Sequence, residues 1–321
     1  MSFILAYRRP KEKLTRPRAA STPGLQEDLM QQMRSKPYRL LKYDDLPEWY
    51  QDNPFCRSGY RPVSESWITC ILSLGHLHNE SMNIYTHLVP AICLIFGQIL
   101  VHSGLNYCYP KASIGDHAVF SIQVNAAIIT MLLSCGYHTM MCHSKDVENF
   151  MLRVDYVGIL TLVVGSFFSG IYVGFYCERV LRRVYWTMIV VLSLITAILV
   201  LHPKLQGRKY RFYRTWAFIS TALSGFAPIG HGLVLYGWNE MWVRSGMPYW
   251  FLEGIIYGIG AWFFLTRIPE SIWPGRFDIW FSSHQFFHIF VVMASLVHLY
   301  GVWVAFDWNY QHQRVCPTSI R

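Results

Sequence analysis

Two histidines with the spacing of metal ligands lie in an otherwise apolar run at residues 282–301, SSHQFFHIFVVMASLVHLYG. His284 and His288 are four residues apart, so on an α-helix they share one face and lie roughly 6 Å apart along the axis. His298 lies about 15 Å beyond His288 and cannot share an ion with the pair. An ionisable side chain in hydrocarbon costs at least a few kcal/mol, so the two histidines need partners from other segments.

The partners are predicted in two other apolar segments. One ends in LLSCGYHTMMCHSK, residues 132–145, which holds His138 with Ser134 one turn deeper on the same face. The next begins RVDYVGIL, residues 153–160, which places Asp155 within the first turn of the expected helix. If these ends lie at the same depth as His284, three imidazoles and one carboxylate meet near one leaflet.

Zinc suits such a set, because neutral imidazole is among its preferred ligands and three histidines leave a fourth position for water. Zinc lowers the pKa of a bound water to about 7, and a neighbouring carboxylate can accept its proton. We therefore predict Zn²⁺ at His138, His284 and His288, with Asp155 as the catalytic carboxylate and Ser134 beside it. Cys142, four residues after His138, is an alternative ligand; a buried histidine can also simply be a hydrogen-bonded packing residue.

The elements that must position these residues are membrane-spanning helices. Of the 321 residues, 53% are apolar, and the apolar residues gather in runs of about the length that crosses a bilayer. The sequence predicts an all-α membrane protein with seven transmembrane helices at about 84–104, 117–141, 154–177, 184–202, 215–236, 247–266 and 284–306.

The distribution of Lys and Arg predicts the orientation of these helices. Of the 28 basic residues, 21 fall in the N-terminal region to residue 83 and in the alternate loops 142–153, 203–214 and 267–283. Basic loops stay on the cytosolic side, so we expect a cytosolic N-terminus and a C-terminus outside. The formal net charge of +9 has its explanation here, and nucleic-acid binding is excluded as its cause.

Four regions are expected along the chain: a disordered basic cytosolic tail over 1–40, a cytosolic juxtamembrane region over 41–83 with an interfacial helix at 64–78, the seven-helix zinc-binding domain over 84–306, and a short non-cytosolic tail over 307–321. Cys108, Cys177 and Cys316 fall on or near the outer side, where two of them could form a disulfide, and the sequence does not say which two.

Other polar residues of the apolar segments are expected to have packing roles. Glu80, Asn83 and His87 share one helical face at the cytosolic level, where hydrogen bonds that cap and hold the helix end are favoured over metal binding. His231 and His298 are expected to pack or to line a cavity.

Three motifs in order resemble the progestin and adipoQ receptor family, which includes the hemolysin III proteins and fungal membrane proteins linked to zinc homeostasis. They are ESMNIYTH at 80–87, SCGYHTMMCHS with DYVGI over 134–159, and SHQFFHIFVV with VHLYG over 283–301. The resemblance covers about residues 40–306 and includes the possibility of the fungal branch. It implies seven helices, a cytosolic N-terminus, zinc on His138, His284 and His288, and Asp155 and Ser134 beside the zinc-bound water.

Adiponectin receptors of that family are associated with ceramidase activity, so the resemblance implies hydrolysis of a lipid amide. The alternative is a non-enzymatic receptor in which zinc only ties helices together. Expected partners are a membrane lipid as substrate or ligand, an extracellular protein ligand and cytosolic signalling proteins, with no nucleic acid. The protein is expected in the plasma membrane or in an endomembrane such as the ER or Golgi. A pore is disfavoured, because no ring of charges crosses the membrane.

Overall fold

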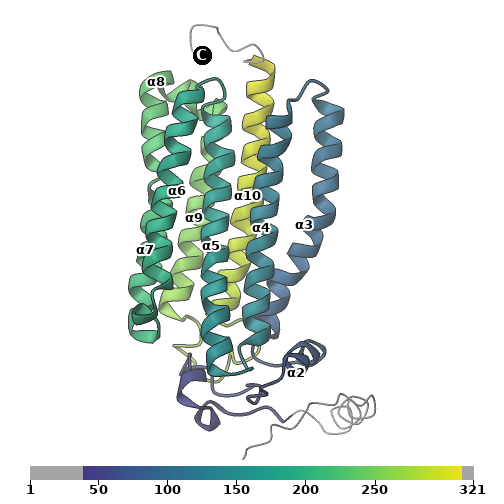
Figure 1. Ribbon diagram of the computed structural model, residues 1–321, viewed down its shortest axis with the longest axis vertical. Helices are drawn as coiled ribbons and strands as arrows, with labels where there is room; N and C mark the ends of the chain where they lie inside the picture. Colours follow the sequence, from purple (N-terminus) through teal and green to yellow (C-terminus); the bar gives the residue numbers. More distant parts are fainter. Residues whose placement is uncertain (1–38, 313–321) are drawn as a thin grey trace, which may run out of the picture. The chain divides into compact units, whose positions relative to one another are not determined.

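The computed structural model describes residues 39–312 of the chain, and this part is helical. It contains no β-strand, only an isolated antiparallel bridge between Leu41 and Tyr60. The long helices run side by side and form a bundle (Figure 1). They are α3 (Ser81–Cys108), α4 (Ile114–Met140), α5 (Lys145–Gly174), α6 (Arg179–Leu201), α7 (Arg211–Leu223), α8 (Phe226–Arg244), α9 (Met247–Thr266) and α10 (Ser283–His312). The predicted tail over 1–40 lies outside the described residues except for its last two.

Six helical segments of the described chain are long and apolar enough to cross a membrane, which confirms an all-α membrane protein. They are α3, α4, α5, α6, the continuous stretch over α7 and α8, and α10. The predicted sixth span, 247–266, coincides with α9, but α9 is not among the six helical segments found. The mean hydropathy of α9 is lowered by its Tyr, Trp and Gly residues and by Glu253.

Local sequence explains several helix ends. Ser113 and Asp116 form a capping box at the start of α4, in which each side chain hydrogen-bonds to the other residue's backbone N–H. α9 follows Gly246, which has a left-handed φ of 66°, and carries a proline in its first turn, where no intrahelical N–H is needed. α5 begins at Lys145, nine residues before the predicted span, with Asp146 and Glu148 in its first turn, where acidic groups suit the helix dipole.

α4 and α5 form the most extensive helix pair of the bundle. Two glycines of α5 allow their backbones to approach closely. A Cβ at Gly158 would lie 3.3 Å from the Cα of Thr130, and one at Gly165 would lie 2.4 Å from the Cβ of Ala126. Small residues at such crossings let membrane helices pack backbone against backbone. The two helices that carry His138, Ser134 and Asp155 are therefore held tightly together.

A short juxtamembrane segment lies beside the end of α4 that carries His138. It contains the 3-10 turns η1 (Tyr43–Asp45), η2 (Glu48–Tyr50) and η3 (Ser73–Gly75) and the helix α2 (Trp67–Leu72). Buried side chains of this segment share one apolar cluster with Tyr137, Met141 and Cys142. The interfacial helix expected at 64–78 is thus shorter in the structure, and Trp67, Ile68 and Ile71 on it are about half exposed.

The structure describes two of the three cysteines that were expected on or near the outer side. Cys177, which follows α5 at the end of the bundle away from His138, is disulfide-bonded. Cys108 is a free, exposed cysteine, and Cys316 lies outside the described residues.

Candidate metal centre

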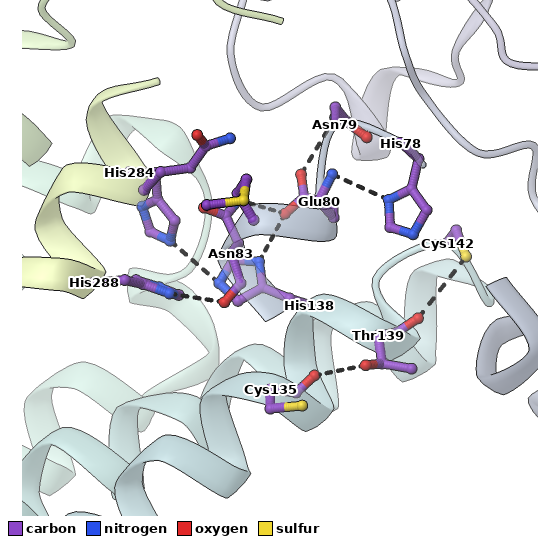
Figure 2. Close-up of polar contacts among 12 residues, drawn as sticks. His78, Asn79, Glu80, Asn83, Cys135, His138, Thr139, Cys142, His284 and His288 are labelled. Atoms are coloured by element: carbon purple, nitrogen blue, oxygen red, sulfur yellow. Dashed lines mark hydrogen bonds and ion pairs between the residues drawn. The ribbon is translucent and has the colours of Figure 1, made fainter. Parts of the chain in front are cut away.

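Three histidines from two helices converge at one end of the bundle. His138 lies in the last turn of α4, whereas His284 and His288 lie in the first two turns of α10. One ring nitrogen from each lies within 4.8 Å of the others, and the Nε2 atoms of His138 and His284 are 3.2 Å apart. Figure 2 shows the three rings turned toward one another. Within the described part of the chain, these three histidines are the one group of at least three His, Cys, Asp or Glu side chains that could hold a metal ion.

The outward nitrogens of two of these rings are bound to oxygen atoms. His138 Nδ1 lies 2.8 Å from Glu80 Oε2, and His288 Nδ1 lies 2.9 Å from the backbone oxygen of Asn83. A carboxylate and a carbonyl can only accept hydrogen bonds, so each Nδ1 carries the proton and donates it. The Nε2 atoms of His138 and His288 are therefore left as lone pairs that face the centre, and a divalent cation fits such a donor set.

Glu80, the N-cap residue of α3, is held in place by several donors. Its carboxylate accepts hydrogen bonds from Asn83 Nδ2 at 2.7 Å and Asn79 Nδ2 at 3.3 Å as well as from His138. Burial would raise the pKa of this carboxyl, but the hydrogen bonds from His138 and Asn83 and the positive charge of Arg61 outweigh burial and lower the pKa below its usual value. Glu80 is thus a carboxylate that orients His138 and offsets positive charge at the centre.

Arg61 fixes the same end of α4 from the other side. Its side chain is fully buried and donates hydrogen bonds to the backbone oxygens of His138 at 2.6 Å and Thr139 at 2.9 Å. The last carbonyls of a helix have no intrahelical partner, so the guanidinium satisfies them and suits the negative end of the helix dipole. The juxtamembrane segment therefore contacts the helix turn that positions His138.

His87, one of the polar residues noted on α3, covers His288. The two rings are stacked with centroids 3.8 Å apart and an interplanar angle of 2°. Both ring nitrogens of His87 are buried without a hydrogen-bond partner among the described residues. The rings of the three-histidine group are thus contacted by His87, Glu80 and Asn83, which do not belong to that group. The Glu80 side chain makes no capping hydrogen bond at the start of α3.

Asp155 and Ser134 lie next to each other across α4 and α5. The Asp155 carboxylate interacts electrostatically with Ser134 and with His138. Because α5 begins at Lys145, Asp155 lies about three turns into the helix rather than in its first turn. Its side chain is half-buried, and Ser134 is buried.

The alternative ligand and the two distant histidines lie elsewhere. Cys142 Sγ lies 3.6 Å from Cys70 Sγ and is not part of the three-histidine group. His231 Nδ1 lies 2.8 Å from the Tyr185 hydroxyl. His298 is held between Glu253 Oε2 at 2.7 Å and Ser169 Oγ at 2.9 Å, as a packing role requires.

Sequence reasoning missed the orienting role of Glu80 and the contact that Arg61 makes with α4. Glu80 had a detectable signal, because it lies in the first turn region of an apolar helix at the predicted depth of His138. Arg61 had none, since it lies in an irregular segment, 77 residues from the backbone oxygen that it binds.

Removing the Glu80 carboxylate is expected to weaken the affinity of the three-histidine group for a metal ion. A carboxylate that orients a ligand histidine typically contributes 10- to 100-fold in metal affinity, so we expect about 10-fold weaker binding for Glu80→Gln and up to about 100-fold for Glu80→Ala. Competition with a chromophoric chelator measures this. Glu253→Gln is the matched control, because it alters an equivalent carboxylate–histidine pair away from the three rings. Unchanged affinity in both Glu80 variants would remove this role.

Comparison with known proteins gives consistent relatives. The family described as Haemolysin-III related matches residues 75–299. Progestin and adipoQ receptor-like protein 1 of Caenorhabditis elegans is 36% identical over 83% of this chain and 60% of its own length. ADIPOR-like receptor IZH2 of Saccharomyces cerevisiae is also 36% identical, over 82% of this chain and 83% of its own length. The adiponectin receptor protein of Drosophila melanogaster is 33% identical over 86% of this chain and 62% of its own length. The chain thus spans less than two thirds of the worm and fly relatives.

Proposed function

Because this chain belongs to the haemolysin-III-related family of multi-pass membrane proteins, we propose that its three-histidine centre binds zinc and hydrolyses the amide bond of a ceramide-like lipid. The observation that carries the proposal is the convergence of His138, His284 and His288, with the outward nitrogens of two rings bound to acceptors. An open fourth position on such a centre suits catalysis, whereas structural zinc sites are usually closed by four protein ligands.

The reaction needs a water, a base and a carbonyl in one place. Zinc at this centre would supply a Lewis acid that polarises the lipid carbonyl and makes a neighbouring water more acidic. Asp155 accepts the proton of the water as the water oxygen adds to the carbonyl carbon, and the neighbouring Ser134 helps to keep that carboxyl group ionised. Asp155 then gives the proton to the amide nitrogen as the C–N bond breaks. The products are a fatty acid and an amine.

Metal removal tests this activity. Purified protein in nanodiscs is expected to release fatty acid from ceramide, to lose this activity after treatment with a chelator and to regain it when zinc is added back. Mass spectrometry of the released fatty acid measures the rate. Absence of hydrolysis above the chelated sample, across a panel of lipid amides and esters, would contradict the enzyme proposal.

A second candidate function is a ligand-sensing receptor with a structural zinc. Two observations favour this function. The three histidines come from the two helices α4 and α10, which a bound zinc would link directly. The relatives also carry the word receptor in their names. In that case zinc would stabilise the bundle, and ligand binding outside would act on cytosolic signalling partners through the helices. The Asp155 variant described in the Discussion distinguishes the two functions.

We further propose seven spans, with α7 and α8 forming one and α9 another, and a cytosolic N-terminus. The excess of Lys and Arg in the N-terminal region and in alternate loops of the sequence supports this orientation. The disulfide of Cys177 supports it as well, because disulfides persist on the oxidising side of a membrane and Cys177 lies at the end away from the histidines.

Accessibility of the two chain ends tests the orientation. A tag at the C-terminus is expected to be reached by a membrane-impermeant label from the non-cytosolic side, and a tag at the N-terminus only after the membrane is opened. Labelling in sealed, oriented vesicles measures both. Labelling of the C-terminal tag from the cytosolic side alone would overturn the proposed orientation.

A further inference from the structure

Two cysteines at the histidine end of the bundle form a close thiol pair. Cys70 belongs to α2, Cys142 lies two residues beyond the last residue of α4, and both are fully buried free cysteines. Their Sγ atoms are 3.6 Å apart, which is a contact distance for two thiols, whereas a disulfide needs about 2.05 Å. The two residues are 72 positions apart in sequence, so the contact is built by the fold.

The surroundings of Cys70 favour its thiolate. Ser64 Oγ lies 3.3 Å from Cys70 Sγ, and the buried Arg61 guanidinium contributes positive charge. The hydrogen bond with Cys142 is the main cause that lowers the pKa of the Cys70 thiol to about 6; Ser64 and Arg61 add to it, and burial opposes it. The same hydrogen bond raises the pKa of Cys142, because Cys142 keeps the shared proton. Cys70 is thus the thiol of the pair with thiolate character, and Cys142 is the partner that holds the shared proton.

We propose that Cys70 and Cys142 form a redox pair that hydrogen peroxide converts into a reversible intramolecular disulfide. The Cys70 sulfur attacks one peroxide oxygen, the O–O bond breaks, and Cys70 sulfenic acid and water form. The Cys142 sulfur then attacks the sulfenic sulfur, the S–S bond forms and a second water leaves. Two thiols lose two electrons and two protons in total, and one peroxide becomes two waters. A dithiol reductant reverses the bond by exchange.

The helix that carries Cys70 can make the small movement that the bond requires. α2 has six residues, and its Trp67, Ile68 and Ile71 side chains are about half exposed, so only one of its faces is held by the cluster around Cys142. The backbone beside the pair is already joined to the end of α4, because Ser64 N donates to Cys142 O at 3.1 Å and Glu65 N to His143 O at 3.0 Å. Closing the bond therefore shifts a sulfur and a short helix without rearranging the bundle.

The disulfide would fasten the juxtamembrane segment to the turn of α4 that carries a metal ligand. Cys142 lies four residues after His138, and Arg61 already binds the His138 backbone oxygen from the same segment. The inference does not depend on the proposed hydrolysis, since the thiol pair is separate from the three histidines. It goes beyond that function by giving the protein a site of oxidative modification.

Oxidation of the full chain in nanodiscs tests the proposal. After mild peroxide treatment and alkylation of the remaining thiols under denaturing conditions, digestion is expected to yield a peptide pair joined between Cys70 and Cys142, lighter by two hydrogens. Dithiothreitol is expected to remove it. Cys142→Ser should stop at the sulfenic acid of Cys70, so that dimedone labels Cys70 at least about 10-fold more than in the unaltered protein.

Matched controls keep the result clear. Cys135→Ser removes another buried free cysteine of α4 and is expected to leave the cross-link unchanged. Cys142→Ala repeats the dimedone experiment with a side chain that cannot hydrogen-bond to sulfur. If Cys70 and Cys142 of the unaltered protein both remain fully alkylated after peroxide has been raised until methionines oxidise, the proposal is overturned. A peroxide-induced disulfide that joins either cysteine to a different one would overturn it equally.

Discussion

The Asp155→Asn protein is expected to keep its zinc and to hydrolyse ceramide about 10²- to 10⁴-fold more slowly than the unaltered protein. An amide has the shape of the carboxyl group and can still meet Ser134, but it cannot accept the proton of the attacking water. The change lies outside the three-histidine group, so the metal should stay. Rates of fatty-acid release and zinc content of the same preparation measure both outcomes.

Asp116→Asn is the control for this experiment. Asp116 is a second aspartate of the α4–α5 pair, but it is buried near the opposite end, where its carboxylate accepts hydrogen bonds from Tyr172 and Tyr176. The Asp116→Asn substitution should lower the stability of the protein without a specific loss of lipid hydrolysis. An Asp155→Asn protein that is folded, zinc-loaded and as fast as the unaltered protein would exclude the role of Asp155 as base. Altered stability or signalling with no activity in either protein would support the receptor function.

Purified protein is expected to contain about one zinc per chain, and the double variant His284→Ala with His288→Ala is expected to contain almost none. Zinc that loses two of three protein ligands keeps a single imidazole, which does not bind it stably in dilute solution. Elemental analysis after gel filtration in metal-free buffer gives the stoichiometry.

His231→Ala serves as the comparison for the double variant, because His231 contacts Tyr185 and lies outside the three-histidine group. It should retain one zinc. Full zinc occupancy in the double variant would show that the ion, if present, is held elsewhere. Half occupancy that survives repeated washing would point to a ligand beyond the three histidines.

Hydropathy predicted most of the helices because lipid imposes one simple rule, that a long apolar run must be helical. The predicted span 247–266 coincides with α9, and 284–306 begins one residue after the start of α10. The gathering of His138 with His284 and His288 was predictable too. Depth along a span follows from counting residues, and ionisable groups at equal depth in a bundle tend to meet.

The rest depended on information that a hydropathy pattern does not carry. α5 begins with the polar residues of 145–153, which count against a membrane span although they are helical. The break between α7 and α8 at 224–225 and the left-handed Gly237 inside α8 lie within one apolar run. Arg61, in an irregular segment, contacts the end of α4, and Cys70, in the short helix α2, contacts Cys142 just beyond that end; neither partner could be chosen without the tertiary fold.

The close approach of α4 and α5 has a mechanical consequence in bilayers of different thickness. A bilayer that is too thin or too thick for a helix makes it tilt. Because Gly158 and Gly165 allow the two backbones to approach closely, α4 and α5 should tilt together as a rigid pair of helices. Ser134 and His138 on one helix and Asp155 on the other would then move through the bilayer together, and the spacing between Asp155 and His138 would stay constant while the surrounding lipid changes.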